Sequence, residues 1–141
     1  MKKSLSLLSV LLVFLAMGFG DAANQLVSIV EKAFDVSPFV ASFVSLFGMI
    51  MFGVLSIPTG VMQSKIGKKK MLSIGLIVFL IGAIFPIVSF SFPIILVSVM
   101  LMGAGATILQ VAGNPLMRDV SSEGKYSSNL SFAQSVKAIG T

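Results

Sequence analysis

The segment Met71–Met117 decides the fold of this chain: MLSIGLIVFLIGAIFPIVSFSFPIILVSVMLMGAGATILQVAGNPLM. It contains no charged residue over 47 positions. A bilayer core of about 30 Å takes roughly 20 helical residues at 1.5 Å each, so the segment is too long for one membrane span and suits two. The break between them is predicted at Ser89–Pro93, where a short hairpin forms and Pro93 opens the next helix in its first turn.

Two further charge-free intervals lie on the N-terminal side of this segment. They are Ser4–Gly20, whose apolar character continues to Val30, and Val36–Ser64. The predicted spans are therefore about 4–30, 38–63, 70–89 and 93–117, and a fifth pattern runs from about 129 to 141. The fold class predicted is an all-α, polytopic membrane helical bundle with four transmembrane helices and the start of a fifth.

The composition agrees with a membrane protein and excludes several classes of function. Of 141 residues, 56% are hydrophobic and 11% charged, whereas soluble domains carry about a quarter charged residues. The absence of His and Cys removes the usual ligands of zinc, haem and iron–sulfur sites, and also thiol and imidazole nucleophiles. We therefore predict no enzyme activity, no cofactor and no metal site.

The positions of the basic residues predict the orientation and argue against a nucleic-acid partner. With the N-terminus inside, the outer side holds only Lys32, whereas the cytoplasmic side holds Lys2, Lys3, Lys65, Lys68, Lys69, Lys70, Arg118 and Lys125. This bias predicts a multi-pass protein of the cell (inner) membrane with a cytoplasmic N-terminus. A cleaved signal peptide is the alternative for the first twenty residues, but the span-length segments that follow are unlike a secreted domain.

Three of the predicted spans carry polar or small residues along one helix face. They are Asp21, Asn24, Gln25 and Ser28 on the first, Gly103, Ala106, Gln110 and Asn114 on the fourth, and Ser131, Gln134, Lys137 and Thr141 on the fifth. Polar groups in a span usually face a bundle interior or a water-filled cavity. Helix packing is the favoured interpretation for Gly103, Gly105 and Gly113, whereas function is favoured for Asp21 and Lys137. A purely structural ion pair between neighbouring helices is the alternative for those two.

The connection between the second and third predicted spans carries a recognisable pattern. Residues Gly60–Lys70, with the sequence GVMQSKIGKKK, resemble the loop motif of the major facilitator superfamily, Gly-x-x-x-Asp-Arg-x-Gly-Arg-Arg-Lys. Ser64 replaces the acidic residue. The matching positions are Gly60, Lys65, Gly67, Lys68, Lys69 and Lys70. A positively charged loop of no special kind is the alternative.

A second resemblance joins the end of the fourth span to the start of the fifth. The segments Gln110–Pro115 (QVAGNP) and Asn129–Gln134 (NLSFAQ), with Gly140-Thr141, are similar to the fucose permease and glucose/galactose permease branch of that superfamily. There an Ala-Asn-Pro segment ends helix four, and Asn-Leu-x-x-Ala-Gln opens helix five. The resemblance implies that residues 1–141 form a partial N-terminal transmembrane domain, about the first third of a transporter. A truncated reading frame is expected, and the fragment alone is not expected to transport.

The same resemblance implies transport by alternating access, in which two six-helix halves rock about a midplane site. Acidic residues of helices one and four are linked in that branch to proton coupling and sugar binding. Here those positions fall on Asn24 and Gln110, so proton-coupled sugar symport is in question. Lys137 falls where the fucose permease offers an amide, and Asp21 supplies a carboxylate one turn before Asn24. The expected substrate-binding residues are Asp21, Asn24, Gln25, Gln110, Asn114, Gln134 and Lys137.

The expected partners are a small solute, the lipid bilayer and the remainder of the transporter. A cationic Lys beside a carboxylate suits an acidic sugar or another anion as well as a neutral sugar. The alternative function is a small membrane subunit or scaffold that acts by helix packing with a partner. A companion reading frame downstream that continues from helix five would distinguish the two.

Overall fold

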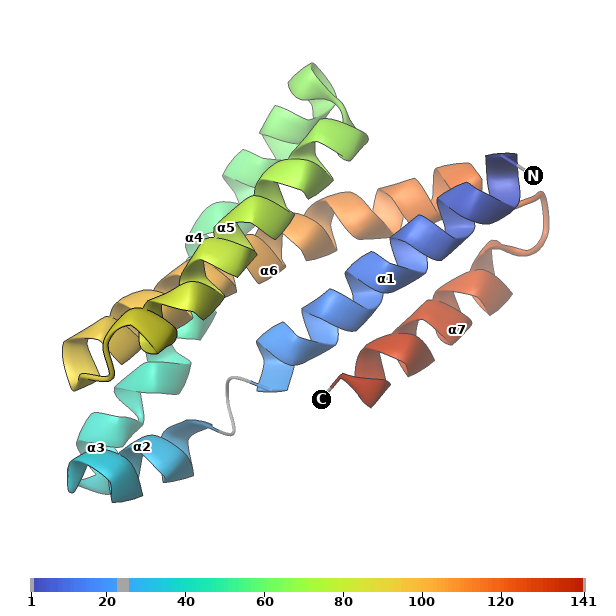
Figure 1. Cartoon of the computed structure of the whole chain (residues 1–141). Helices are drawn as coiled ribbons and strands as arrows, with labels where there is room; N and C mark the ends of the chain where they lie inside the picture. Colours follow the sequence, from blue (N-terminus) through green and yellow to red (C-terminus); the bar gives the residue numbers. More distant parts are fainter. Residues whose placement is uncertain (1, 23–25, 141) are drawn as a thin grey trace.

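The computed structural model describes the backbone of residues 2–22 and 26–140, and the side chains of residues 7–18 and 27–140. Every regular element of this described part is an α-helix, which confirms the predicted all-helical bundle. The elements in chain order are α1 (Lys2–Ala22), α2 (Leu26–Phe34), α3 (Pro38–Ala41), α4 (Phe43–Ile66), α5 (Lys68–Val88), α6 (Phe92–Val120) and α7 (Tyr126–Ile139) (Figure 1).

Three stretches of the described chain are long and apolar enough to cross a membrane. They are Pro38–Ile66, which comprises α3 and α4, Lys68–Val88 and Phe92–Val120. A shorter apolar helix covers Leu7–Gly18. The three long stretches coincide with the second, third and fourth predicted spans, because a bilayer of fixed thickness demands apolar runs of fixed length. The shorter helix lies within the first predicted span.

The first predicted span differs in detail from the structure. One helix was expected over about 4–30, whereas α1 ends at Ala22 and α2 runs from Leu26 to Phe34. A helix of nine residues is too short to cross a bilayer. Its buried Val30 instead packs with Val44 of α4 and Val99 of α6. Apolar content therefore continues past the first span because α2 has an apolar face of its own.

The helix boundaries follow from Ser, Pro and Gly at expected places. The Ser37 hydroxyl accepts a hydrogen bond from the Val40 amide at 3.4 Å and caps α3, and Ser91 precedes α6 with Pro93 in its first turn, as predicted. Only Gly67 separates α4 from α5. Its φ of 89° lies in the region that a residue with a Cβ rarely adopts, so glycine is required at this turn.

Helices α5 and α6 approach each other so closely that glycines form their contact. A Cβ on Gly105 would lie 2.5 Å from the Phe79 nitrogen, and one on Gly82 would lie 2.7 Å from the Met102 nitrogen. The buried Ser98 hydroxyl donates a hydrogen bond to the Gly82 carbonyl at 2.7 Å. Small residues allow this approach, and hydrogen bonds between helices add to it in a membrane.

The remaining helices pack around α6. A Cβ on Gly103 would lie 3.1 Å from the Cα of Gly48 on α4, so the packing interpretation of Gly103 and Gly105 agrees with the structure. Helix α1 lies between α6 and α7 (Figure 1). Phe14 of α1, Leu109 of α6 and Ala133 of α7 are fully buried in the cluster that joins these three helices.

The two lysine-bearing regions lie at opposite ends of the bundle. Phe34 of α2 stacks on Phe90 with ring centroids 5.0 Å apart, which places Lys32 and its helix beside the turn between α5 and α6. The turn between α4 and α5 lies at the other end (Figure 1). We call the end that contains Lys65–Lys70 and Arg118 the basic end.

We predict that the basic end is cytoplasmic, because basic residues gather on the inner side of membrane proteins. The natural chain has no cysteine, so a single cysteine at position 69 or 91 gives an unambiguous label. In intact cells, an impermeant thiol reagent is expected to label Ser91→Cys and to leave Lys69→Cys unlabelled. Permeabilised cells are the control, in which both variants should react. Labelling of the variant at position 69 in intact cells would contradict the orientation.

Candidate functional site

The predicted polar face of α6 is buried against a neighbouring helix at its beginning and exposed at its end. It begins at Gly103, which packs against α4, and continues at Thr107, which is fully buried and donates a hydrogen bond to the Gly103 carbonyl at 2.7 Å. Gln110 is half-buried, and Asn114, one turn further, is exposed. The two amides are therefore presented together near the end of a helix that is otherwise largely apolar.

The predicted residues of α7 lie beside α1. Gln134 is exposed and Lys137 is half-buried. A Cβ on Gly18 of α1 would overlap the Lys137 carbonyl oxygen and would lie 3.0 Å from the Cα of Gly140. The backbones of α1 and α7 therefore touch at Gly18 and Lys137, and only a glycine permits this contact.

The predicted residues of the first span are placed only in part. Asp21 belongs to the last turn of α1, and its side chain, like Asn24 and Gln25, lies outside the described part. Asp21 follows Gly18 by three residues, about 4.5 Å along the helix axis. The structure thus brings the backbone of Lys137 to within about one helical turn of Asp21.

The amides of the two other helices are not joined to each other. Among the described residues, no hydrogen bond links Gln110, Asn114 and Gln134. Helix α1 contacts both α6 and α7, so it connects the two polar faces. The donors and acceptors of these side-chain amides can therefore form hydrogen bonds with a ligand.

The motif predicted as a loop is helical except at Gly67. Lys65 lies in the last turn of α4, and Lys68, Lys69 and Lys70 form the first turn of α5. Both helices continue past the apolar spans because lysine side chains can reach water while their stems pack on apolar surface. The connection between the second and third predicted spans is therefore a single residue, Gly67, whose positive φ requires glycine.

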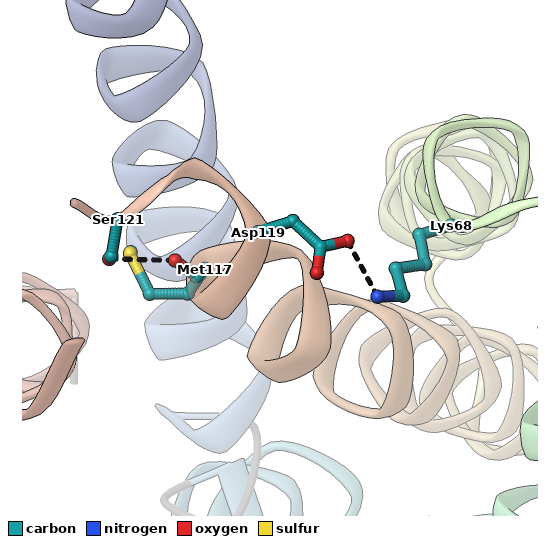
Figure 2. A network of polar contacts seen from close by, with 4 residues as sticks. All are labelled: Lys68, Met117, Asp119 and Ser121. Carbon is teal, nitrogen blue, oxygen red and sulfur yellow. Dashed lines mark hydrogen bonds and ion pairs between the residues drawn. The ribbon is translucent and has the colours of Figure 1, made fainter. Parts of the chain in front are cut away.

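An ion pair organises this motif. The Lys68 ammonium lies 2.6 Å from the Asp119 carboxylate, which joins the start of α5 to the end of α6 (Figure 2). The Ser121 hydroxyl donates a hydrogen bond to the Met117 carbonyl at 2.7 Å and closes the last turn of α6. The two charged side chains are 34% and 51% exposed, so the pair contributes about 0–1 kcal/mol.

Sequence reasoning did not identify Asp119. One signal was present: Asp119 is the only acidic residue between Asp35 and Glu123, and it ends a span on the same side as the lysine run. A lone carboxylate at that place is a natural counter-charge for a lysine. The pattern predicts a pair but not which lysine forms it.

A cavity of about 580 Å³ lies at the same end of the bundle, between α4, α5 and α6. Gly67 and the three lysines of α5 line it together with Asp119 and Gln63. The Gln63 side-chain oxygen is buried there without a hydrogen-bond partner among the described residues. The cavity therefore offers one unsatisfied acceptor beside several cations.

Comparison with known proteins identifies the family. Residues 8–141 match the sequence profile described as Major Facilitator Superfamily. The chain belongs to the major facilitator superfamily. Members of this superfamily are multi-pass membrane transporters and not enzymes, in agreement with the prediction from the residues.

Curated members of the superfamily are similar to this chain along most of its length. The glucose/galactose transporters of Brucella abortus biovar 1 (strain 9-941) and Brucella abortus (strain 2308) are each 28% identical over 140 residues, which is 96% of this chain and 34% of theirs. The L-fucose-proton symporter of Haemophilus influenzae is 26% identical over 132 residues, which is 91% of this chain and 31% of that protein. This major facilitator chain thus spans about one third of the length of these relatives. No solved structure matches it.

Proposed function

We propose that this chain forms the first part of a major facilitator transporter that moves a sugar or a related solute by alternating access. The observation that carries this proposal is the polar face of α6, where half-buried Gln110 and exposed Asn114 interrupt a largely apolar helix. Solute sites of such transporters lie near the bilayer midplane, between repeated halves. Similarity to sugar transporters over nearly the whole chain supports the choice of solute.

The charges of α1 and α7 favour a solute with an acidic group or several hydroxyls. Lys137 lies on the helix that touches α1 one turn from Asp21. A lysine in this place binds a carboxylate as readily as a hydroxyl, so acidic sugars and other small anions belong to the expected class. If transport is coupled to protons, Asp21 is the acidic group of the proposed site, since Asn24 and Gln110 are amides.

We also propose where the chain lies in the transporter and in the membrane. Residues 1–141 form a partial N-terminal transmembrane domain in the cell inner membrane, with the N-terminus cytoplasmic. Its first span is α1 rather than the whole of 4–30, and the further spans lie at about 38–63, 70–89, 93–117 and 129–141. Proposed site residues are Asp21, Asn24, Gln25, Gln110, Asn114, Gln134 and Lys137.

An uptake assay on the complete transporter that contains this chain tests the proposal. Cells that produce it are supplied with radiolabelled galactose, L-fucose or galacturonate, and accumulation of at least one of them above vector control is expected. Gln110→Leu is expected to reduce that uptake about tenfold, because the solute loses a desolvated hydrogen bond worth about 1–2 kcal/mol.

Ser56→Ala on α4 is the matched control, since it also removes a polar group from a span and lies outside the proposed site. It is expected to keep uptake near the parental rate. Correctly inserted protein that accumulates none of the three solutes would contradict the sugar assignment and favour a scaffold that acts by helix packing.

A further inference from the structure

A second cavity at the basic end combines a charged rim with apolar walls. It has a volume of about 310 Å³ and lies between the beginnings of α1 and α5 and the end of α6. Ser9, Lys69 and Ser73 form its polar rim, and its apolar walls include Val13 and Leu72. Its volume is at the lower end of the range of ligand cavities, about 300–1,000 Å³. This cavity is separate from the proposed solute site.

The start of α5 carries more positive charge than its surroundings balance. The N-terminus of a helix has a partial positive charge of about half an elementary unit, so cations in the first turn are unfavourable there. Three lysines occupy this turn and no acidic residue does. Asp119 pairs with Lys68, whereas neither Lys69 nor Lys70 forms an ion pair with a described residue. An anion at the cavity would reduce this repulsion.

The place of the cavity decides the kind of anion. It opens at the start of α5 and the end of α6, two helices long enough to span a bilayer, where lipid headgroups meet the protein. Basic pockets between transmembrane helices bind the phosphates of lipid headgroups, and apolar walls suit the glycerol and the first carbons of the acyl chains. We propose that this second cavity, which we call the groove, binds the headgroup of an anionic phospholipid.

Two side chains of the rim, Lys69 and Ser73, can contact the headgroup phosphate. The exposed Lys69 ammonium has three donors and pairs with a phosphate oxygen. The Ser73 hydroxyl donates to the Lys69 carbonyl at 3.3 Å, a long hydrogen bond that a phosphate oxygen can replace. Val13 and Leu72 then contact the apolar part of the lipid.

Native mass spectrometry of the purified full chain tests the proposal. The protein in detergent is titrated with palmitoyl-oleoyl phosphatidylglycerol and, separately, with phosphatidylcholine of the same chains. Preferential retention of phosphatidylglycerol is expected, and Lys69→Gln should weaken it about fivefold, as expected for one lysine near an anionic headgroup. Lys65→Gln is the matched control, because it removes the same charge from an exposed position that does not line the groove.

Two further arms separate the lipid from other occupants. Val13→Phe fills the groove without changing the charge and is expected to lower retention, while circular dichroism checks that the helices are intact. An excess of inorganic phosphate is expected to leave the lipid bound. Three results would each overturn the proposal: displacement of the lipid by phosphate, equal retention of both lipids, or an equal loss of lipid retention in Lys65→Gln and Lys69→Gln.

Discussion

Alanine at Gly105 is expected to disrupt the contact of α5 with α6 and to destabilise the folded protein by about 3 kcal/mol, the upper part of the usual range for overpacking. The nearest atoms to the new methyl group would be the Phe79 nitrogen at 2.5 Å and the Phe79 Cα at 2.7 Å. Backbone atoms cannot rotate away as a side chain can, so the two helices must separate. The hydrogen bond from Ser98 to the Gly82 carbonyl would be strained by the same movement. A denaturation titration in mixed detergent micelles, followed by circular dichroism, measures the loss.

Gly53→Ala is the matched control for this prediction. Position 53 lies within α4, and a Cβ there would have no atom within 4 Å. This substitution is expected to leave the denaturation midpoint unchanged or slightly raised, because alanine favours helix more than glycine does. Equal midpoints for the variants at 53 and 105 would show that the close approach of α5 and α6 does not contribute to stability.

Asp21→Asn and Lys137→Gln are expected to impair transport strongly when made singly, and less than additively when combined. We propose that the two residues form a charge pair that the solute disrupts or joins. Removing one partner leaves the other charge uncompensated in a membrane, which costs several kcal/mol, so about a hundredfold loss of uptake is expected for each single variant. The contact of Gly18 with the Lys137 carbonyl supports the pairing, because it holds the two helices together within one turn of Asp21.

A double-mutant cycle on the complete transporter measures this coupling. If the pair exists, the double variant recovers part of the uptake, and the coupling energy is about 1–3 kcal/mol. Lys125→Gln, at the basic end and before α7 begins, is the control for loss of a single positive charge. Fully additive losses of uptake would show that the charge pair does not exist. Lys137 would then be interpreted as a direct ligand of an anionic solute.

Most of the fold could be predicted because the membrane constrains it so tightly. A span must exclude charge over a fixed length, so the positions of Lys70 and Arg118 alone bound two helices, and Pro93 marks where the second of them begins. The division between α1 and α2 could not be predicted in this way. Hydropathy measures how apolar a segment is, and α2 is apolar because it packs on α4 and α6, not because it spans.

The candidate site could be predicted only as faces of single helices. Periodicity places Gln110 and Asn114 on one side of α6, and Gln134 and Lys137 on one side of α7. It does not tell which helix lies opposite, because that depends on contacts between residues far apart in sequence. Two such long-range contacts are the approach of Gly18 to Lys137 and the pairing of Lys68 with Asp119. Only the folded chain shows them.

The single-residue connection at Gly67 determines how the lysine run is displayed. Because α5 begins at Lys68, the three consecutive lysines leave the helix about 100° apart around its circumference. Lys68 meets Asp119, and Lys69 reaches the groove beside α1. All three lysines line the cavity of about 580 Å³, but they differ in their other contacts, because Lys68 pairs with Asp119 and Lys69 also lines the groove. The place of the glycine therefore sets which lysine meets Asp119 and which lines the groove, a consequence that the composition of the motif does not carry.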